Sequence, residues 1–404
     1  MNKHRAAGHI VIIILFCVGA IALISAPDMK PNLLMISIDT CRADAISREN
    51  TPNIMKLADY GSRFDDVTCV AGITLPSHCS IMTGQYPVRH GVRNNRRYIL
   101  NDSAVTLAEV LKEHGYSTAA FISAFVLDSR FGMDQGFDIY DADVHIAPNE
   151  PTSGQNMRPA DETTEAVLKW LAGSSDPFFL FVHYFDPHGS RSPSKHTLSR
   201  KGGREGAIEN YYREVRFVDD NLDWIFNLEN TVIVITADHG EQLWERGIKG
   251  HAFHLYEQEV RIPLIVYVPW QEPGIYEYPV SSVDIFATVL GILGIPAPEG
   301  YDGINLFDDS KRVIYSETQY PLEYNSYAFR HGDMKFIKYD WKKQTDECLL
   351  FDVKADPGEK YNLATGTMDG SINMISSYLS GEKLSKYDHG PEVRERLKSL
   401  GYVE

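Results

Sequence analysis

Residues 72–84 (GITLPSHCSIMTG) place a hydroxyl side chain, Thr74, in a turn with proline and serine just before a helix-forming segment. Either Ser77 or Ser80 is a suitable N-terminal cap for that helix. The first turn of a helix offers backbone N–H groups and a positive dipole end, which stabilise a bound anion. A nucleophile at that position is well placed to attack an anionic ester. We therefore predict that Thr74 is a nucleophile.

Three apolar runs, NLLMISI, FFLFV and TVIVITA, lead into side chains that can bind a metal ion. These side chains are Asp39, the pair Asp186 and His188, and the pair Asp238 and His239. Because open α/β sheets bind ligands at the carboxyl ends of their strands, we expect them to lie near one another. Carboxylates and imidazoles without cysteine suit zinc, manganese or magnesium, and calcium is less natural where histidine is a ligand. Each residue alone also fits a structural role, so the prediction depends on their shared position.

The charge of the chain supports a metal rather than a basic binding surface. The 404 residues carry a formal charge of -16, which argues against nucleic acid as a partner. An acidic protein that acts on an anionic ester needs local positive charge, which metal ions supply. We expect one or two divalent ions of zinc, manganese, magnesium or calcium. Such an ion would lower the pKa of the Thr74 hydroxyl and polarise the ester as a Lewis acid.

Residues 1–26 have the pattern of a targeting segment. Basic residues at positions 3 and 5 precede the almost wholly apolar run 10–26. A membrane-spanning helix takes roughly 20 apolar residues, so this run is near the lower limit. We predict either a secretory signal peptide or an uncleaved membrane anchor. Either one places the rest of the chain outside the cytoplasm, in the periplasm or the extracellular space.

The five cysteines, Cys17, Cys41, Cys69, Cys79 and Cys348, are odd in number and show no CxxC spacing. This pattern predicts neither a zinc knuckle nor a disulfide framework. A bridge between Cys69 and Cys79 stays open as an alternative in an oxidising compartment.

Apolar strands alternate with amphipathic helices up to about residue 311, which predicts an α/β fold with a mixed or mainly parallel sheet covered on both faces. The predicted strands cover residues 32–38, 64–70, 117–123, 178–182, 231–237 and 263–268. The predicted helices cover residues 54–60, 105–114, 162–172, 210–226 and 284–293. We interpret residues 128–160 as a surface loop and residues 190–206 as a flexible flap.

The pattern changes at residue 312. Four short segments, 313–317, 327–330, 335–339 and 348–352, predict a hairpin-type sheet, and residues 391–400 predict a helix. We therefore divide the chain into a targeting segment at 1–26, a catalytic α/β domain at 31–311 and a C-terminal α+β subdomain at 312–404.

Residues 31–404 contain a series of segments that resemble, in the same order, the sulfatase family of the alkaline phosphatase superfamily. The segments are PNLLMISIDTCRAD, TPNIMKLADYGSRF, TLPSHCSIMTG, HGVRNN, FFLFVHYFDPH, TADHGE, LYEQEVRIPLIVYVP, LFDVKADPGEKYNL and LKSLGYVE. The resemblance implies a large mixed central sheet between helices, with a small C-terminal antiparallel sheet and a helix beside it. It also implies a metal-dependent hydrolase of anionic esters.

The chain departs from the family at the site itself. Sulfatases carry Cys or Ser at the nucleophile position of C-x-P-S-R and convert it to formylglycine. Thr74 stands there instead, and its branched Cβ cannot be oxidised to that aldehyde. His78 replaces the arginine of the motif, Thr40 replaces the second residue of an Asp-Asp pair, and His239 replaces the asparagine of an Asp-Asn pair.

These differences make the site similar to the threonine-nucleophile members of the superfamily, which hydrolyse or transfer phosphodiesters. They include nucleotide pyrophosphatase/phosphodiesterases and the phosphoethanolamine and lipoteichoic acid transfer enzymes. In the diesterase branch, the resemblance implies that one metal is held by the equivalents of Asp39, Thr74, Asp238 and His239.

The same resemblance implies a second metal held by Asp186, His188 and His251, with His254 as the alternative to His251. With a single metal, His188 would instead bind substrate or donate a proton. All three histidines are candidates for protonating the leaving group, because histidine titrates near neutral pH.

We also predict that the backbone N–H near Leu75, together with Arg93, Asn94 and His254, binds the substrate, although ordinary surface polarity explains Arg93 and Asn94 equally well. The preferred substrate class is a phosphodiester. The alternatives are sulfate ester hydrolysis without formylglycine, transfer of a phosphoethanolamine-type group, and a membrane-tethered binding protein with a degenerate site.

Overall fold

The computed structural model describes residues 30–95, 98–144, 157–175, 177–189, 199–320, 324–341 and 347–364. The chain divides into residues 1–30 and residues 31–404, and the description below concerns the second unit. The predicted targeting segment at 1–26 and the predicted helix at 391–400 lie outside the described residues. Within them, every helix is too short or too polar to cross a bilayer.

A nine-stranded mixed sheet forms the centre of the unit and confirms the predicted architecture. Its strands are β1 (Asn32–Ile38), β2 (Ser62–Thr68), β3 (Ser117–Phe121), β4 (Ile139–Asp141), β5 (Phe178–Tyr184), β6 (Thr231–Thr236), β9 (Arg261–Tyr267), β10 (Gly274–Tyr276) and β11 (Val280–Ser281). They follow the order β10-β2-β9-β6-β1-β5-β3-β4, with β11 also paired to β2. β1 lies parallel to both β5 and β6, and β9 is antiparallel to β2 and β6.

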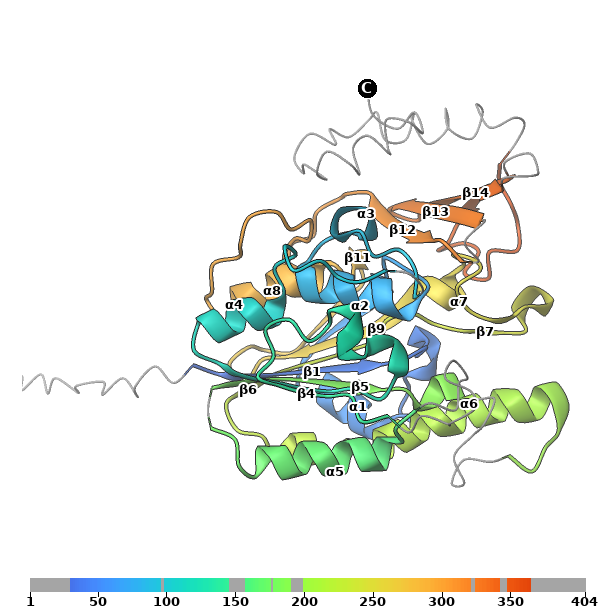
Figure 1. The fold of residues 1–404 in the computed structure, drawn as a ribbon. Helices are drawn as coiled ribbons and strands as arrows, with labels where there is room; N and C mark the ends of the chain where they lie inside the picture. Colours follow the sequence, from blue (N-terminus) through green and yellow to red (C-terminus); the bar gives the residue numbers. More distant parts are fainter. Residues whose placement is uncertain are drawn as a thin grey trace, which may run out of the picture. The chain divides into compact units, whose positions relative to one another are not determined.

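Helices cover both faces of this sheet, which is why its central strands are apolar along their whole length. The helices are α1 (Pro52–Ala58), α2 (Thr74–Thr83), α3 (Pro87–His90), α4 (Leu107–Glu113), α5 (Ala160–Leu171), α6 (Gly203–Asp220), α7 (Glu257–Val260) and α8 (Asp284–Ile292). Figure 1 shows α1, α5 and α6 on one face and α2, α4 and α8 on the other. Every residue of β1, β5 and β6 is buried.

The structure corrects several predicted boundaries. α6 begins at Gly203, inside the segment predicted as a flap, and ends at Asp220, before a separate short 3-10 helix at Asp223–Asn227. Strand β4 lies inside the predicted loop 128–160 and adds to the edge of the sheet beside β3. This strand has only three residues and none is buried, so it leaves no apolar run in the sequence.

The C-terminal segments form the predicted antiparallel sheet, in the order β12-β13-β14-β15. Its strands are β12 (Ile314–Thr318), β13 (Tyr324–His331), β14 (Met334–Trp341) and β15 (Glu347–Asp352). Tyr315 and Phe329 of this sheet share a hydrophobic core with Val70 and Tyr86 of the preceding region. The boundary at residues 311 and 312 stays a prediction. The four cysteines in the described residues are free, so the alternative of a Cys69–Cys79 bridge is not realised.

Candidate active site

The register of the central strands brings the predicted metal ligands together. Ser37 of β1 pairs with His183 of β5 and with Thr236 of β6. Asp39, which follows β1, and Asp238, which follows β6, therefore emerge side by side at the same edge of the sheet. The carboxyl ends of parallel strands are where open α/β sheets bind ligands.

Asp39, Asp238 and His239 form a compact group in which one ligand atom from each residue lies within 4.8 Å of the others. Thr74 joins this group, because its Oγ1 lies 3.4 Å from Oδ2 of Asp39 and 3.3 Å from Nε2 of His239. All four side chains are buried. The structure thus brings together the four residues that the resemblance implied for one metal.

Thr74 is the first residue of α2, and this position corrects the predicted helix start. The N-cap is Ile73, and no side chain caps the helix. Pro76 is tolerated there because the backbone N–H groups of the first turn have no partner within the helix. The hydroxyl of Ser77 instead donates to the carbonyl of Asp238 at 2.7 Å, which ties the helix to the end of β6.

His239 has a fixed orientation and tautomer. Its ring Nδ1 contacts the carbonyl of Gly240 at 2.9 Å and must donate to it, so Nε2 carries the free electron pair that faces Thr74. Burial lowers its pKa to about 3, and nearby His251 adds to the shift. A neutral imidazole oriented by a backbone carbonyl is the usual form of a histidine that binds a metal.

Two buried carboxylates face each other without a matching positive charge. Burial raises the pKa of Asp39 well above its ordinary value, and the charges of Asp238 and Glu241 raise it further. Burial also raises the pKa of Asp238. Oδ1 of Asp39 and Oδ2 of Asp238 have no hydrogen-bond partner. Buried charges are normally paired or bound to metal, so this donor set fits a divalent cation.

Thr40 and His78 fill the positions where the chain departs from the family. Thr40 adopts a positive φ of 53°, and its hydroxyl donates to the carbonyl of Asp39 rather than facing Asp238. A β-branched residue at positive φ is strained, and such strain is concentrated at functional sites. His78 donates from Nδ1 to the carbonyl of Thr74 at 2.9 Å, and its Nε2 accepts from the hydroxyl of Ser37 at 2.9 Å. His78 thus links the backbone of Thr74 to Ser37 of β1.

Two of the three residues predicted for a second metal, His188 and His251, lie close together. The rings of His188 and His251 lie 4.9 Å apart between centroids, and the His251 ring lies 4.4 Å from that of His239. Asp186 instead accepts from the N–H of Ala160, the first residue of α5, and burial raises its pKa to about 8. Among the described residues the three form no ligand group like the first one. The second metal stays a prediction.

The residues predicted to bind substrate oxygens already have protein partners. Arg93 forms a two-point ion pair with Glu317 of β12, at 2.6 and 2.8 Å. The side-chain amide of Asn94 donates to the carbonyl of Gln319. His254 faces the hydroxyl of Tyr339 in β14, with Nδ1 at 3.2 Å from it. These contacts attach all three residues to the C-terminal sheet.

Sequence reasoning missed three residues at the site. The side chain of Asn95, not Asn94, accepts from the N–H of Leu75 at 2.8 Å. Glu241 lies 2.7 Å from Nδ1 of His251 and orients that ring. His183 lies with its Nε2 at 3.3 Å from Oδ2 of Asp39. His183 directly follows the apolar run FFLFV, so the strand-end criterion that identified Asp39 could also have identified it.

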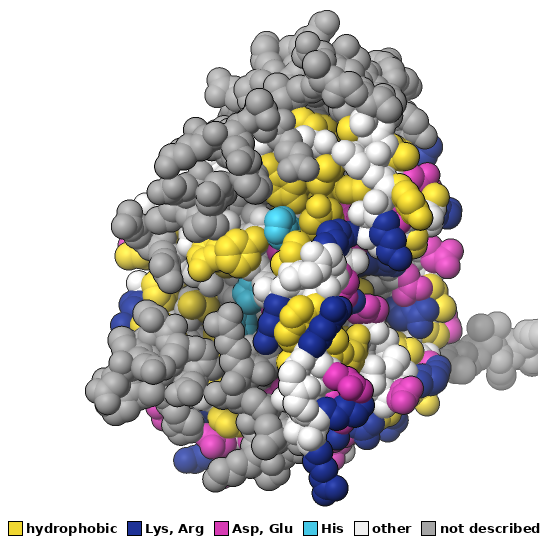
Figure 2. All heavy atoms as spheres, turned by 90° about the vertical axis from the view of Figure 1, so that its right-hand side faces the viewer, with side chains coloured by type: hydrophobic (Ala, Val, Ile, Leu, Met, Phe, Trp, Pro, Cys, Tyr) yellow, Lys and Arg dark blue, Asp and Glu magenta, His cyan; other side chains and the backbone are white. Residues whose placement is uncertain are grey.

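The histidine group extends from the buried carboxylates toward solvent. His188, His251 and His254 are half-buried, whereas His239 is fully buried. Figure 2 shows histidine side chains at the surface of one face, between hydrophobic side chains and close to lysine and arginine side chains.

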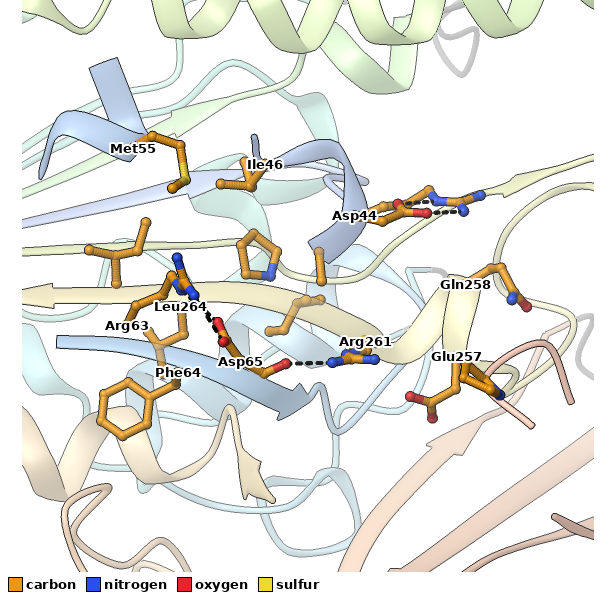
Figure 3. Close-up of a pocket in the computed structure, with 16 residues that line it drawn as sticks. Asp44, Ile46, Met55, Arg63, Phe64, Asp65, Glu257, Gln258, Arg261 and Leu264 are labelled. Carbon is orange, nitrogen blue, oxygen red and sulfur yellow. Dashed lines mark hydrogen bonds and ion pairs between the residues drawn. The ribbon is translucent and has the colours of Figure 1, made fainter. Parts of the chain in front are cut away.

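A separate cavity of about 530 Å³ lies over β2 and β9, away from this group. None of Thr74, Asp39, Asp238 or His239 lines it. Figure 3 shows Arg63 bonded to the carboxylate of Asp65 and Arg261 bonded to the backbone carbonyl of Asp65, and Asp44 accepts from Arg42. The arginines that line this cavity are thus already paired, whereas the candidate site is the group around Thr74.

Comparison with known proteins identifies the family of the chain. The family model described as Sulfatase matches residues 31–295. An ulvan-active sulfatase from Formosa agariphila is 24% identical over 447 residues, covering 93% of this chain and 85% of that protein. Arylsulfatase A from Homo sapiens is 25% identical over 436 residues, covering 86% of each.

The fold is also similar to that of solved ester hydrolases. The phosphonate monoester hydrolase of Agrobacterium radiobacter superimposes with a TM-score of 0.69 at 19% identity, covering 92% of this chain and 95% of that one. At this identity the likeness shows the fold alone, and the family model supplies the assignment. The chain belongs to the sulfatase family of the alkaline phosphatase superfamily, a family of ester hydrolases.

Proposed function

We propose that this protein is a metal-dependent hydrolase of phosphate esters, with phosphodiesters as the preferred class and Thr74 as the nucleophile. One observation carries the proposal. The hydroxyl of Thr74, at the first turn of α2, lies 3.3 and 3.4 Å from ligand atoms of His239 and Asp39, inside a buried group with an excess of negative charge.

Asp39, Asp238 and His239 would hold the cation, with Thr74 Oγ1 beside it. When bound, a divalent ion would supply Lewis-acid polarisation of the ester and favour the ionised form of the threonine hydroxyl. To hold the ion, the chain needs only the two carboxylates and the imidazole named above. Calcium fits less well than zinc or manganese, because a histidine is among the ligands.

The side chains of the site can carry out a two-step displacement. Thr74 Oγ1 donates a hydrogen bond to Asp39, so that carboxylate is placed to accept the hydroxyl proton as the new O–P bond forms. The bond from phosphorus to the leaving alcohol breaks, and His251 or His188 donates a proton to the departing oxygen. Water then attacks the phosphothreonine, which releases the phosphate monoester and restores the hydroxyl.

The positive groups that we predicted for the substrate already have partners in the described part of the chain, which favours a substrate with a single negative charge. Arg93 is neutralised by Glu317, and the N–H of Leu75 is occupied by Asn95. Burial lowers the pKa of His78, which stands where the family has arginine. A phosphodiester carries one charge and a phosphate monoester about two near neutral pH. The solved hydrolase from Agrobacterium radiobacter is named for phosphonate monoesters, which are also singly charged.

Sulfate ester hydrolysis is the second candidate, because both curated relatives above are named sulfatases. A sulfate ester also carries one charge. Its difficulty lies in the second step, since a sulfated threonine has no easy elimination route. The hydrated aldehyde of formylglycine provides that route in sulfatases, and Thr74 cannot become formylglycine.

A substrate panel with matched variants tests the proposal. Metal-loaded protein is assayed on aryl phosphodiesters, phosphonate monoesters, phosphate monoesters and sulfates. We expect the phosphodiester to give the highest kcat/KM and Thr74→Ala to lower it by about 10³-fold or more. Thr83→Ala is the control, because Thr83 ends the same helix and its hydroxyl bonds the carbonyl of Cys79 and the N–H of Gln85, none of which belongs to the candidate site. A Thr74→Ala variant with near-native turnover, or a sulfate preferred over every phosphorus ester, would refute the proposal.

A further inference from the structure

Phe253 and Tyr320 form an aromatic pair that the proposed reaction does not use. Their ring centroids lie 5.1 Å apart, and the planes of the rings meet at 74°. Phe253 is 44% exposed and Tyr320 is half-buried, so the pair lies at the surface. An isolated exposed apolar residue needs no explanation, whereas an exposed aromatic pair beside a reactive group marks a surface that can bind a ligand.

Tyr320 adjoins the start of the helix that carries the nucleophile. It packs against a small buried cluster, which consists of Ala71, Ile73 and Ala252. Ile73 is the N-cap of α2 and directly precedes Thr74. The aromatic pair therefore contacts the chain within one residue of the proposed nucleophile.

Phe253 belongs to the loop that carries a proposed proton donor. His251 precedes Phe253 by two residues, and its ring lies 4.4 Å from that of His239 between centroids. Nε2 of His239 lies 3.3 Å from Thr74 Oγ1. Figure 2 shows hydrophobic side chains next to histidine side chains on this face. The pair thus adjoins both the nucleophile and the histidine that would protonate the leaving group.

Contacts on both sides of Phe253 hold its backbone in place. The hydroxyl of Thr318 donates to the carbonyl of Ala252 at 2.6 Å. The N–H of His254 donates to the carboxylate of Glu259 at 3.3 Å. Phe253 lies between these two anchored residues while its ring stays exposed. A side chain on a backbone that is already ordered binds a ligand at a lower cost in conformational entropy.

We propose that Phe253 and Tyr320 bind a flat aromatic group on the leaving alcohol of the ester. The inference rests on the proposed function and narrows its substrate class to aryl phosphodiesters. A flat group that stacks on one ring meets the other edge to face, because the two planes lie 74° apart. Stacked and edge-to-face contacts are the arrangements that aromatic rings prefer. The leaving side is favoured because Phe253 shares a loop with His251.

Two esters with leaving alcohols of similar acidity test the pair. Methyl phenyl phosphate and methyl hexafluoroisopropyl phosphate both release methyl phosphate, and only the first has an aromatic leaving group. The ratio of their kcat/KM values is measured for metal-loaded wild type and each variant. Because both rates come from one protein sample, the ratio does not depend on how much of a variant is folded.

We expect Phe253→Ala to lower the phenyl-to-fluoroalkyl ratio about tenfold, since truncating a stacking side chain has effects of this size. Phe253→Leu keeps an apolar side chain without a ring and should also lower the ratio. Phe253→Tyr keeps the ring and should hold the ratio within about threefold of wild type. Tyr320→Leu removes the second ring, keeps an apolar side chain against the cluster and should lower the ratio as well.

Trp270→Ala is the matched control. Trp270 is 58% exposed and follows β9, whose last residue pairs with Ile233 near the beginning of β6. Asp238 follows the other end of β6, so Trp270 lies toward the opposite edge of the sheet from the candidate site. Removing this exposed ring should leave the ratio as in wild type.

The outcomes distinguish this inference from the proposed function. If Phe253→Ala and Tyr320→Leu lower kcat/KM equally for both esters, or leave the ratio within about threefold of wild type, the pair does not bind the leaving group. The proposed function then still stands with its other residues. If wild type hydrolyses neither ester, the proposed function fails, and this inference fails with it.

Discussion

Hydrogen bonds fix the tautomer of three buried histidines near Thr74, which are His239, His78 and His90. His239 donates to the carbonyl of Gly240 and His78 donates to the carbonyl of Thr74, so the second ring nitrogen of each is an acceptor. His90, at the end of α3, uses the opposite tautomer. Its Nδ1 accepts from the N–H of Val92 at 3.2 Å, and its Nε2 contacts the hydroxyl of Ser80 at 2.9 Å. Protonating any of these rings removes an acceptor that the fold uses.

His90 should therefore make the protein less stable in acid. Burial lowers its pKa to about 3, whereas in the unfolded chain it is near 6.5. Between these values the unfolded state binds more protons, so the free energy of unfolding falls as pH drops below about 6.5. At pH 5 this one ring should cost about 2 kcal/mol.

We expect His90→Gln to lose less stability than wild type between pH 7.5 and pH 5, measured by urea unfolding of the metal-free proteins. Each protein is compared with itself at the two pH values. The packing that the substitution removes is the same at both values and therefore cancels. Equal losses in the two proteins would show that His90 does not titrate as its burial implies.

At the scale of elements, the position of Thr74 depends on the C-terminal sheet as well as on the central one. The segment after α3 runs between α2 and β12. The side chain of Asn95 accepts a hydrogen bond from the N–H of Leu75 in the first turn of α2. Arg93 forms an ion pair with Glu317 of β12. The isolated bridge between Ala71 and Glu317 adds a backbone contact at the same place. The C-terminal sheet thus helps to position the helix that carries Thr74.

Arg93→Ala should consequently act on stability. Glu317 is 1% exposed, and removing its partner leaves a buried charge uncompensated, which typically costs 3–5 kcal/mol, so about that loss is expected. Chemical denaturation measures it, and the double variant Arg93→Ala/Glu317→Ala should lose less than the sum of the two single variants.

Arg48→Ala is the control for this prediction, because Arg48 pairs with Asp59 at the surface, where ion pairs contribute about 0–1 kcal/mol. If Arg93→Ala leaves the free energy of unfolding unchanged and only raises KM, Arg93 binds substrate as the sequence predicted.

At the scale of the whole molecule, an acidic chain encloses a buried acidic site. The formal charge is -16, and two of the carboxylates that it counts, Asp39 and Asp238, are fully buried. Elsewhere the fold compensates buried carboxylates with cations, as where Lys335 lies 2.8 Å from Glu257 and 2.9 Å from Glu359. The candidate metal site has no such lysine or arginine among the described residues, so a bound cation would complete it.

Removing metal should therefore lower the thermal stability of the whole unit. A ligand that binds only the folded state at about 1,000 times its Kd adds about 4 kcal/mol. Chelation should lower Tm by several degrees, and adding zinc or manganese should restore it.

The effect of chelation should grow with pH. Because the pKa of Asp39 is raised in the fold, the metal-free folded state holds a proton that the unfolded chain has lost above pH 4. The stability of the metal-free protein therefore falls as pH rises. Calorimetry at pH 6 and pH 8, with and without chelator, tests this. A Tm that chelation leaves unchanged at both values would contradict the metal site.

The sequence by itself determined the strands and residues whose signals are local. β1, β5 and β6 were predictable because strands covered on both faces must be apolar throughout. Asp39, Asp238 and His239 were predictable because they end such strands. Edge strands such as β4 were not, because three half-exposed residues leave no pattern.

Only the tertiary structure decided which partner each side chain meets. Glu317 lies 224 residues after Arg93, and His183 reaches Asp39 only because β5 pairs with β1. Composition and periodicity report whether a position is buried, and they carry no information on what a side chain faces across the sheet. The fold places His183 beside Asp39, Arg93 beside Glu317 and Asp186 beside the N–H of Ala160, because a contact depends on how the strands pair and not on residue type alone.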